Sequence, residues 1–378
     1  MSKPAIRIDT IPVHELEAFA DRARNEKGVV PITPRRARSH AANPNAVPDE
    51  IALLVAYDGD CCIGFLGIMA GVIRAGGESQ RMHWFSSWYV DPDQATSGAG
   101  TMLLMRAIGL KYDLAVTGTS PEADDMYRAM RFKEIGPLEY EEVFMDMLDP
   151  LGFPFFAVGK WLEKRGKSAK IPYAIADVLR PFLQPLLKRI VYALTTPAMP
   201  SNVVGRVAQS FENDSQATTE ARFERNAATV NWMLAHPWFA ENEDDAVSGY
   251  YFGDVRPIFR YIATSLEREG VEIGNAVVLA SRKSGRTTVK LLDYSFKNDE
   301  DSPVLVRHVL EVASRYKADR ILLPAAFKQA LRQQTVFGRI TFSRTRTYFC
   351  RPKKKNSTLS PLLDQVKLQL TDGDCAFS

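Results

Sequence analysis

Alternating apolar and polar positions divide the first third of the chain into short strands and amphipathic helices. Residues 6–9 predict a strand and residues 13–24 a helix. The apolar runs 51–57 and 62–69 flank Asp58-Gly59, which supplies the positive φ of a tight turn, so they predict a β-hairpin. Residues 74–80 then turn the chain into an aromatic run, 84–90, which predicts a strand that stops at Asp91-Pro92.

A glycine-containing loop follows the aromatic strand and leads directly into a helix. The loop covers residues 93–100, and the apolar periodicity of residues 101–108 is helical. A helix N-terminus attracts anions, because its backbone N–H groups are unpaired and its dipole is positive there. Gly98 and Gly100 would let a phosphate approach the backbone closely. On its own this short pattern is also that of a simple turn at the start of a helix.

A second strand and a second helix come next. Residues 114–118 predict a buried strand. Residues 120–132 predict a helix with Ser120 as N-cap, Pro121 in the first position and acidic residues in the first turn. Residues 133–135 and 140–147 would supply closing strands, and Asp149-Pro150 would end a first domain.

This arrangement resembles the acyl-CoA core of the GNAT superfamily of N-acetyltransferases. The family has a strand ending in Val-x-Pro, a loop Arg/Gln-x-x-Gly-x-Gly/Ala, and a helix Asn-x-x-Ala-x-x-x-Tyr-x-x-x-Gly-Phe. The matching positions here are Val90-Asp91-Pro92, Gly98-Ala99-Gly100, Ala123, Tyr127 and Phe132. The chain departs from the pattern at Ala95, Ser120 and Arg131, where the family often has Arg or Gln, Asn, and Gly. Ala95 lacks a side chain that would help to fix the loop or the phosphates, although Gln94 is adjacent.

The resemblance implies acetyl-CoA or another acyl-CoA as co-substrate, a small-molecule amine as acceptor, and no metal. Pantetheine would run antiparallel along the aromatic strand. The cofactor-binding positions implied by the family are Tyr89, Val90, Ala95, Thr96, Ser97, Gly98, Ala99, Gly100, Thr101, Ser120, Ala123 and Tyr127.

Acyl transfer to an amine needs a base, a donor for the developing oxyanion and an acid for the leaving thiolate. By resemblance, the oxyanion donor is a backbone N–H near Val90 or Asp91, and Tyr127 is the acid. A Tyr pKa near 10 suits a thiolate of pKa about 8.5. His83 is the candidate base, with Asp91 or a water-relayed carboxylate as alternatives. In the purely structural interpretation, Tyr127 is a core aromatic and His83 a packed strand residue.

Residues 30–45 are rich in proline and arginine and predict a loop. In the resembled fold this region covers the acceptor site, so its basic residues are candidates for contact with an anionic acceptor; the alternative is a solvated basic loop. These residues are Arg35, Arg36, Arg38 and His40.

The composition changes after residue 150. Residues 151–215 combine apolar clusters, prolines and basic side chains, with eight Lys or Arg and two acids between Lys160 and Arg189. We predict a basic helical connector whose charges are solvated. The alternative is contact of 153–192 with an anionic membrane surface, since no run reaches the roughly 18 apolar residues needed to span a bilayer.

A second copy of the fold is predicted over residues 216–352. It would comprise a helix at 223–234, strands at 250–252, 273–280, 287–294 and 320–324, and a helix at 304–316. Its loop 297–303 carries Asp299, Glu300 and Asp301, which would repel a pyrophosphate at the helix N-terminus. We therefore expect only the first domain to bind acyl-CoA. Residues 362–370 predict a last helix or strand, and 353–378 a C-terminal tail.

Length and composition agree with two soluble domains. The chain has 378 residues, 46% of them hydrophobic and 25% charged, and its net charge of +3 is too small to imply DNA binding. The first residues lack the apolar run of a signal peptide, and adjacent Cys61 and Cys62 suit a strand in a reducing compartment. We expect an α/β (α+β) protein of two GNAT-like domains, 1–150 and 216–352, each a mixed twisted sheet flanked by helices, in the cytoplasm or at the inner membrane surface.

Three functions remain open at this stage. The first is an acyl-CoA-dependent N-acyltransferase that acts on an amine of a small metabolite, sugar or envelope precursor. We expect it to be an acetyltransferase. The second is a Fem-type transferase that takes its acyl group from aminoacyl-tRNA, which the Gly98-Ala99-Gly100 loop disfavours. The third is a non-catalytic adaptor at a membrane surface that retains only the fold. Ala95 and Arg131, which depart from the family pattern, favour this interpretation.

Overall fold

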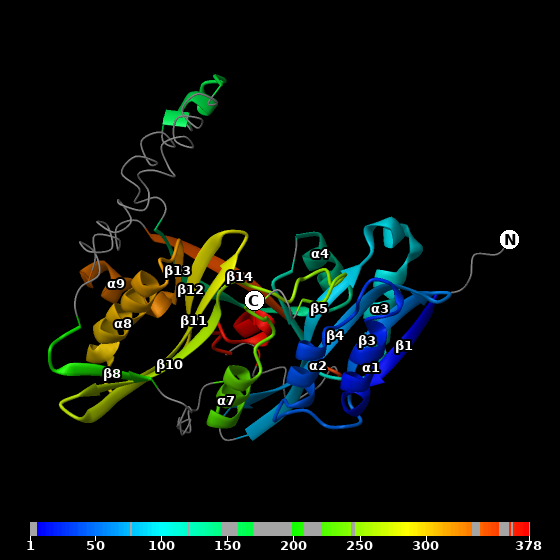
Figure 1. The fold of residues 1–378 in the computed structure, drawn as a ribbon, viewed down its shortest axis with the longest axis horizontal. Helices are drawn as coiled ribbons and strands as arrows, with labels where there is room; N and C mark the ends of the chain where they lie inside the picture. The colour runs from blue at the N-terminus through cyan, green and yellow to red at the C-terminus, as the bar shows by residue number, and fades with distance from the viewer. Residues whose placement is uncertain are drawn as a thin grey trace. The chain divides into compact units, whose positions relative to one another are not determined.

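The computed structural model describes residues 6–75, 78–119, 121–145, 158–159, 161–168, 199–207, 221–242, 246–334, 341–354, 363 and 366–377. The chain forms two compact units, and each is assembled from separate stretches of sequence (Figure 1). The first unit comprises Met1–Leu138, Ser210–Phe259 and Thr345–Ser378, and the second comprises Glu139–Gln209 and Arg260–Arg344.

The first unit is built on a mixed sheet with the strand order β1-β3-β4-β5-β6-β14. These strands are β1 (Arg7–Pro12), β3 (Ile51–Asp58), β4 (Cys61–Ala75), β5 (Glu78–Val90), β6 (Leu114–Thr117) and β14 (Thr341–Arg351). The predicted hairpin is confirmed: β3 and β4 pair antiparallel around Gly59, which has φ 59°. β5 and β6 pair parallel, whereas β6 and β14 pair antiparallel. Short strands β2 (Lys27–Gly28) and β9 (Arg222–Phe223) also pair with β4.

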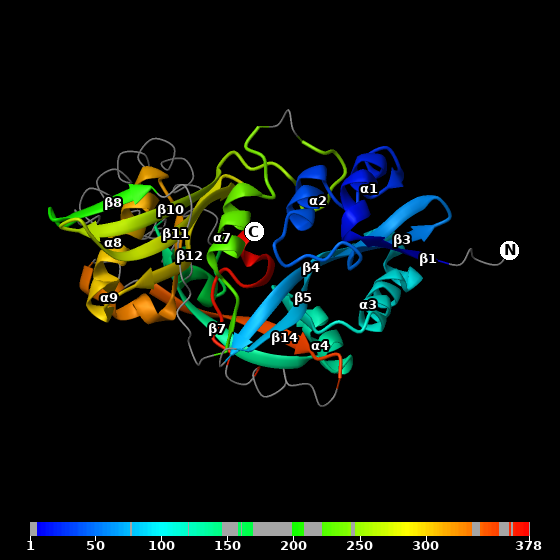
Figure 2. The ribbon, with the colours of Figure 1, turned by 90° about the horizontal axis from the view of Figure 1, so that it is seen from below.

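Helices cover both faces of this sheet (Figure 2). On one face lie α1 (Leu16–Ala23), α2 (Pro34–Ala41) and α7 (Ala227–Ala235), and on the other lie α3 (Ala99–Gly109) and α4 (Pro121–Ala129). The alternation of β3 explains the two layers, because successive side chains point to opposite faces. Leu53 packs in the α1 and α2 core, and Leu54 packs in the α3 and α4 core.

The loop predicted at 30–45 is wrong, because residues 34–41 form helix α2. Thr33 caps this helix by accepting a hydrogen bond from the Arg36 amide, and Pro34 occupies its first turn. The solvated-loop interpretation is wrong as well for Arg36 and His40, which are each only 5% exposed. Arg38 is exposed and Arg35 is half-buried. The sequence signal for α2 was the Thr-Pro pair, which the high content of arginine obscured.

The second unit contains a sheet with the order β7-β13-β12-β11-β10-β8. Its strands are β7 (Lys133–Phe144), β8 (Val203–Val207), β10 (Phe259–Arg268), β11 (Val271–Lys283), β12 (Arg286–Phe296) and β13 (Arg320–Pro324), and its helices include α8 (Ser302–Arg315) and α9 (Lys328–Gln334). The strands predicted at 273–280, 287–294 and 320–324 and the helix at 304–316 are therefore confirmed. The two closing strands predicted at 133–135 and 140–147 form one strand, β7.

Several predictions for the second half of the chain are wrong. Residues 250–252 form a turn and not a strand, and the helix predicted from residue 223 begins at Ala227. The last helix or strand predicted at 362–370 is described only in part: Leu363 is helical, and Lys367 makes one isolated bridge with Arg222. The C-terminal tail ends in a short 3₁₀ helix, η8 (Gly373–Phe377), whose Phe377 is 2% exposed.

Other predictions fall outside the described residues. They are the N-cap at Ser120, the domain end at residues 149–150, and most of the basic connector, including most of the proposed membrane contact at 153–192. Among the helices that the structure describes, none is long and apolar enough to cross a membrane.

The two units contain the same strand-helix-strand join. In the first, β5-α3-β6 has Lys111 at φ 58° after the helix, and the Asp113 carbonyl accepts a 2.7 Å hydrogen bond from the amide of His83. In the second, β12-α8-β13 has Lys317 at φ 51°. The Asp319 amide donates a 2.7 Å hydrogen bond to the Thr287 carbonyl oxygen, and the Thr287 amide donates to Asp319 Oδ2 at 2.7 Å. The two joins therefore share a left-handed lysine after the helix and an aspartate that is bonded to the first strand, although the backbone hydrogen bonds run in opposite directions.

Candidate active site

The parallel strands β5 and β6 pair over a very short length. Their register joins His83 to Leu114 and Trp84 to Ala115, and no pair follows. β6 instead pairs on its other side with β14, through Val116 and Phe349 among others. From Ser86 onward, the backbone edge of β5 that faces away from β4 is therefore not paired with β6 and is available to a ligand.

A β-bulge shapes β5 just beyond the last paired residue. Gly67 of β4 pairs with Ser86 and Leu66 pairs with Trp88, so Ser87 is the additional residue. Ser87 has φ 68°, an unusual conformation for a residue other than glycine. The strands approach so closely here that a Cβ on Gly67 would lie 2.1 Å from the Ser86 carbonyl oxygen. The bulge changes the direction of every backbone group that follows it.

Beyond the bulge, the alternation of an antiparallel pair decides which amides are free. The Asp91 amide donates to the Ile63 carbonyl oxygen at 2.9 Å, so it does not serve as an oxyanion donor. Adjacent residues in such a pair point their N–H groups in opposite directions. The amides of Val90 and Trp88 therefore face away from β4, toward the unpaired edge of β5. Of the two predicted donors, the geometry favours Val90.

The N-terminus of α3 follows directly. Residues Pro92–Ser97 form a 3₁₀ helix, η2, and Gly98 takes φ 85° as the N-cap of α3, a conformation that favours glycine. The Ser97 hydroxyl accepts a hydrogen bond from the Ala99 amide at 3.2 Å. Among the described residues, no hydrogen bond from the amides of Gly100 or Thr101 is found. Ala95 and Thr96 are exposed beside them.

Trp88 adds a side-chain donor that the sequence analysis missed. Its Nε1 is buried and has no hydrogen-bond partner among the described residues. The ring lies against α3, because a Cβ on Gly100 would be 3.6 Å from Trp88 Cζ2 and 3.5 Å from Val90 Cγ2. A buried indole N–H usually has a partner. This donor lies beside the free amides of α3. The sequence signal was a tryptophan two residues before the Val-x-Pro motif.

Tyr127 lies on α4 within an aromatic cluster. It is 1% exposed, and its ring centroid is 6.0 Å from that of Trp88 and 5.0 Å from that of Phe132. Burial, and then the charge of Asp124, raise the pKa of Tyr127. Ala123, one turn earlier, is partly buried in the same cluster. The geometry is therefore compatible with Tyr127 as a core aromatic and with Tyr127 as the acid, because its buried ring contacts the strand that carries the unpaired edge.

Arg131 ends α4 in the place where the family often has glycine. It has φ 63°, the left-handed conformation that terminates many helices and favours glycine. The Phe132 amide still donates to the Tyr127 carbonyl oxygen at 2.9 Å, so this end of the helix has the expected turn despite the different residue.

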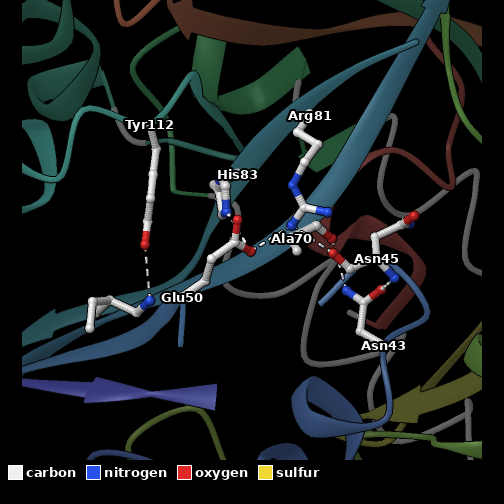
Figure 3. A network of polar contacts seen from close by, with 8 residues as sticks. Asn43, Asn45, Glu50, Ala70, Arg81, His83 and Tyr112 are labelled. Carbon is white, nitrogen blue, oxygen red and sulfur yellow. Dashed lines mark hydrogen bonds and ion pairs between the residues drawn. The ribbon is translucent and has the colours of Figure 1, made fainter. Parts of the chain in front are cut away.

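His83 lies in a network of polar contacts with Glu50 and Arg81 (Figure 3). It is 5% exposed and stacks on Tyr112 with ring centroids 4.0 Å apart, and its Nε2 is 3.2 Å from Glu50 Oε2. Burial raises the pKa of Glu50, but His83 and Arg81 outweigh it, so the net shift is downward. Seven residues of strand separate His83 from Val90, about 23 Å at ~3.3 Å per residue. The structure thus does not bring His83 together with the loop at α3.

A buried arginine approaches the bulge from the opposite face of the sheet. Arg36 Nη1 donates to Ser87 Oγ at 2.5 Å, and the guanidinium carbon lies 4.3 Å from the Trp238 ring and 5.0 Å from the Tyr250 ring. Burial lowers the pKa of Arg36, while Tyr250, Asp374 and Asp254 act against that shift. Burial, and then the charge of Arg36, lower the pKa of His40 to about 3. The Arg36 guanidinium thus donates a hydrogen bond to the hydroxyl of Ser87, the residue that forms the bulge.

No family model and no curated protein sequence matches this chain. Among solved structures, a GCN5-related N-acetyltransferase from Anabaena variabilis ATCC 29413 superposes with a TM-score of 0.51 at 9% sequence identity, over 93% of this chain and 73% of that one. Eis1 from Mycobacterium abscessus gives a TM-score of 0.45 at 13% identity, over 93% and 74% of the two chains. At 9% identity, the likeness to the Anabaena variabilis protein shows the fold alone. The mixed α/β architecture expected from the sequence is the fold of GCN5-related N-acetyltransferases.

Proposed function

We propose that this protein is an acyl-CoA-dependent N-acyltransferase that transfers its acyl group to an amine. One observation carries the proposal: the unpaired edge of β5 runs from the bulge at Ser87 to the open N-terminus of α3. A strand edge offers hydrogen bonds to the amides of a pantetheine arm, and the helix N-terminus offers amides to a pyrophosphate.

Particular residues fit this co-substrate. The amides of Gly100 and Thr101 would bind phosphate oxygens, and the exposed Gly98 leaves the approach open because nothing lies within 4 Å of a Cβ placed on it. The orphaned Nε1 of Trp88 would donate to an oxygen of the same ligand. Ala95 contributes no side-chain donor, so the affinity would depend on backbone groups.

The second unit lacks these features at its equivalent join. Asp301 precedes α8, is 3% exposed and forms a 2.7 Å ion pair with Arg268. A carboxylate already lies at the positive end of that helix, where it would repel a phosphate. We therefore assign acyl-CoA binding to the first unit only.

The chemistry uses groups of the first unit. The amine nitrogen attacks the thioester carbonyl, and an amide of β5, Val90 or Trp88, would donate to the developing oxyanion. The C–S bond then breaks and Tyr127 would give its proton to the thiolate sulfur. The attacking nitrogen loses one proton to solvent and Tyr127 regains one from solvent, so the products are an amide and free CoA. Because burial raises its pKa, Tyr127 stays protonated throughout the pH range of an assay, but it is a weaker acid than a free tyrosine.

Calorimetric titration of acetyl-CoA tests the assignment, with Gly100→Glu as the variant. A Cβ at Gly100 meets only ordinary contacts, so the variant should fold while its carboxylate repels the pyrophosphate. Gly109→Glu is the matched control, since it places the same side chain in open space at the other end of α3. We expect micromolar binding that only Gly100→Glu abolishes. Absence of binding for acetyl-CoA and longer acyl-CoAs would overturn the proposal in favour of tRNA or an adaptor role.

A further inference from the structure

A short helical element of the second unit carries an exposed tryptophan. Residues 158–159 and 161–164 are helical, and Trp161 is 50% exposed. The other four tryptophans of the chain are buried or half-buried: Trp84, Trp88, Trp232 and Trp238. Because a tryptophan side chain is large and mostly apolar, half-exposure leaves much apolar surface in water. The surface at Trp161 is therefore a candidate for contact with another molecule.

A second apolar side chain and a cation share this face of the helix. Val158 is 48% exposed and precedes Trp161 by three residues, so the two side chains lie on the same helix face. Arg165 follows Trp161 by four residues, and its guanidinium carbon lies 3.9 Å from the centroid of the Trp161 ring. This distance is that of a cation–π contact. An apolar surface and a positive charge therefore lie side by side on one helix face.

The end of the helix adds two lysines at the same place. Gly166 takes φ 66°, and the Lys167 amide donates to the Leu162 carbonyl oxygen at 2.9 Å. This hydrogen bond is typical of a helix that stops at a glycine. Lys164 and Lys167 lie on either side of the stop, and both are exposed. The helix therefore ends in three cations, which are Lys164, Arg165 and Lys167.

The charge of this part of the chain differs from that of the rest. Between Lys160 and Arg189 there are eight Lys or Arg residues and two acids, whereas the whole chain has a net charge of +3. The remainder of the chain is therefore net negative. Glu163 is the only acid in the sequence from 158 to 168. An anionic surface would attract this stretch and repel the rest of the protein, so it would also orient the molecule.

The combination of groups favours a lipid surface over other anionic partners. Tryptophan is enriched at the membrane–water interface, where its ring lies among the headgroups, and nearby lysine and arginine are attracted by anionic lipids. The aliphatic Val158 would leave water at a bilayer surface, whereas nucleic acids are bound through phosphate contacts, base edges and stacking. A connector that is merely solvated would expose its charges and cover its apolar side chains, but here Val158 and Trp161 are exposed as well.

We propose that the face formed by Val158, Trp161, Lys164, Arg165 and Lys167 docks the protein on a membrane surface rich in anionic lipids. The two apolar side chains enter the headgroup region, and the three cations contact lipid phosphates. The inference goes beyond acyl transfer and does not rest on it. It concerns the surface at which the protein acts, and acyl-CoA binding is assigned to the other unit.

Sedimentation with vesicles tests the proposal. The vesicles consist of phosphatidylcholine alone or of phosphatidylcholine mixed with phosphatidylserine. We expect binding only to the vesicles with phosphatidylserine, weakened by added salt. Lys164→Gln combined with Lys167→Gln should weaken it roughly 25-fold, about fivefold for each cation near an anionic surface. The matched control is Lys283→Gln with Arg286→Gln, which removes two exposed cations from the turn between β11 and β12. Thermal unfolding verifies that both double variants fold.

Fluorescence shows whether Trp161 itself enters the lipid. Its emission should shift to shorter wavelength on binding, and Trp161→Phe should abolish most of that shift while binding persists. Trp161→Ser should weaken binding about tenfold, as for an aromatic side chain that is no longer removed from water. Phe342→Ala is the matched control and should bind like the unmodified protein. Phe342 is 39% exposed in the same unit, and the guanidinium carbon of Arg344 lies 5.7 Å from its ring centroid.

Several outcomes would overturn the inference. They are equal binding to both kinds of vesicle, binding to neither, equal weakening by the control pair of substitutions, and an unchanged emission shift in Trp161→Phe. Binding of tRNA that the two lysine substitutions abolish, without vesicle binding, would assign the face to nucleic acid instead.

Acetyl-CoA titration separates this inference from the proposed function. Vesicle binding without acetyl-CoA binding would support the membrane contact and contradict the transferase. Acetyl-CoA binding without vesicle binding would overturn the membrane contact and leave the transferase standing.

Discussion

At the scale of single residues, the bulge at Ser87 is the feature on which the proposed acyl-transfer geometry depends. Ser87 occupies a left-handed conformation, and its hydroxyl accepts from Arg36, a guanidinium that is 5% exposed. A buried charge is costly to remove from water, and strained backbone tends to persist at functional sites. Arg36 therefore acts as a positioning residue for the amides that follow Ser87.

Arg36→Met should separate this positioning role from a role in binding. The apolar substitute fills the aromatic surroundings but releases Ser87, so we expect thiol release from acetyl-CoA in the presence of an amine to fall roughly tenfold in kcat, with little change in KM for acetyl-CoA, as for loss of one charged hydrogen bond. Ser87→Gly loses the same hydrogen bond but adopts the same φ without strain, so its kcat should fall less than that of Arg36→Met. Equal damage by both variants, or none by Arg36→Met, would contradict the role.

Tyr127 has two interpretations, core aromatic and acid, that one substitution distinguishes. Tyr127→Phe keeps the ring among Phe85, Phe132 and Phe349 and removes only the hydroxyl. If Tyr127 protonates the thiolate, kcat for thiol release should fall by roughly 10²-fold, the range of a general acid. The melting temperature should change little. An unchanged kcat would leave Tyr127 as a core residue only.

At the scale of elements, the sequence predicted correctly the turns and caps that depend on residues close together in the chain. The hairpin at Gly59 and the glycine loop before α3 follow from turn and capping preferences within a few residues. The helix α2 was missed although Thr33-Pro34 is a start signal, because its basic residues suggested solvent. Burial of those residues depends on Trp238 and Tyr250, some two hundred residues away, which no local pattern reveals.

The C-terminal segment is the clearest case of such long-range packing. Phe377 stacks on Trp238 with ring centroids 4.3 Å apart, and Trp232 meets it edge-on at 5.3 Å. Phe377→Ala should lower the free energy of unfolding by about 3–5 kcal/mol, as for other buried aromatic residues. Chemical denaturation followed by tryptophan fluorescence measures this change. A loss below ~0.5 kcal/mol, the usual effect of a surface substitution, would mean that the segment is a free tail in solution.

At the scale of the whole molecule, each unit is assembled from distant stretches of chain, and β14 returns to the sheet of the first unit after the second unit. A pattern read in chain order predicts contiguous domains, because it carries no information about such returns. The candidate site followed from the sequence where it lies in one stretch, at Gly98 to Tyr127. Arg36 packs against Trp238 and Tyr250, which lie in a distant stretch of the chain, so only the structure revealed its burial.

Each unit contains a buried histidine that stays neutral in the folded chain, so the free energy of unfolding should depend on pH. Burial lowers the pKa of His40 to about 3 and that of His308 to about 4, each helped by a nearby arginine. Between pH 6.5 and 4 the unfolded chain binds protons that the folded chain does not, so the free energy of unfolding should rise with pH, by up to about 1.4 kcal/mol per pH unit for each histidine. His40→Gln should reduce that slope in denaturation curves at pH 5 and 6; an unchanged slope would contradict a neutral buried His40.

The central claim is that the first unit binds acyl-CoA along β5 and at the N-terminus of α3. The most direct measurement is calorimetric titration of acetyl-CoA into the unmodified protein, Gly100→Glu and Gly109→Glu. The account predicts micromolar binding with a stoichiometry of one, lost in Gly100→Glu and kept in Gly109→Glu. Two sites per chain would contradict the exclusion of the second unit by Asp301, and equal binding by all three proteins would contradict the site at α3.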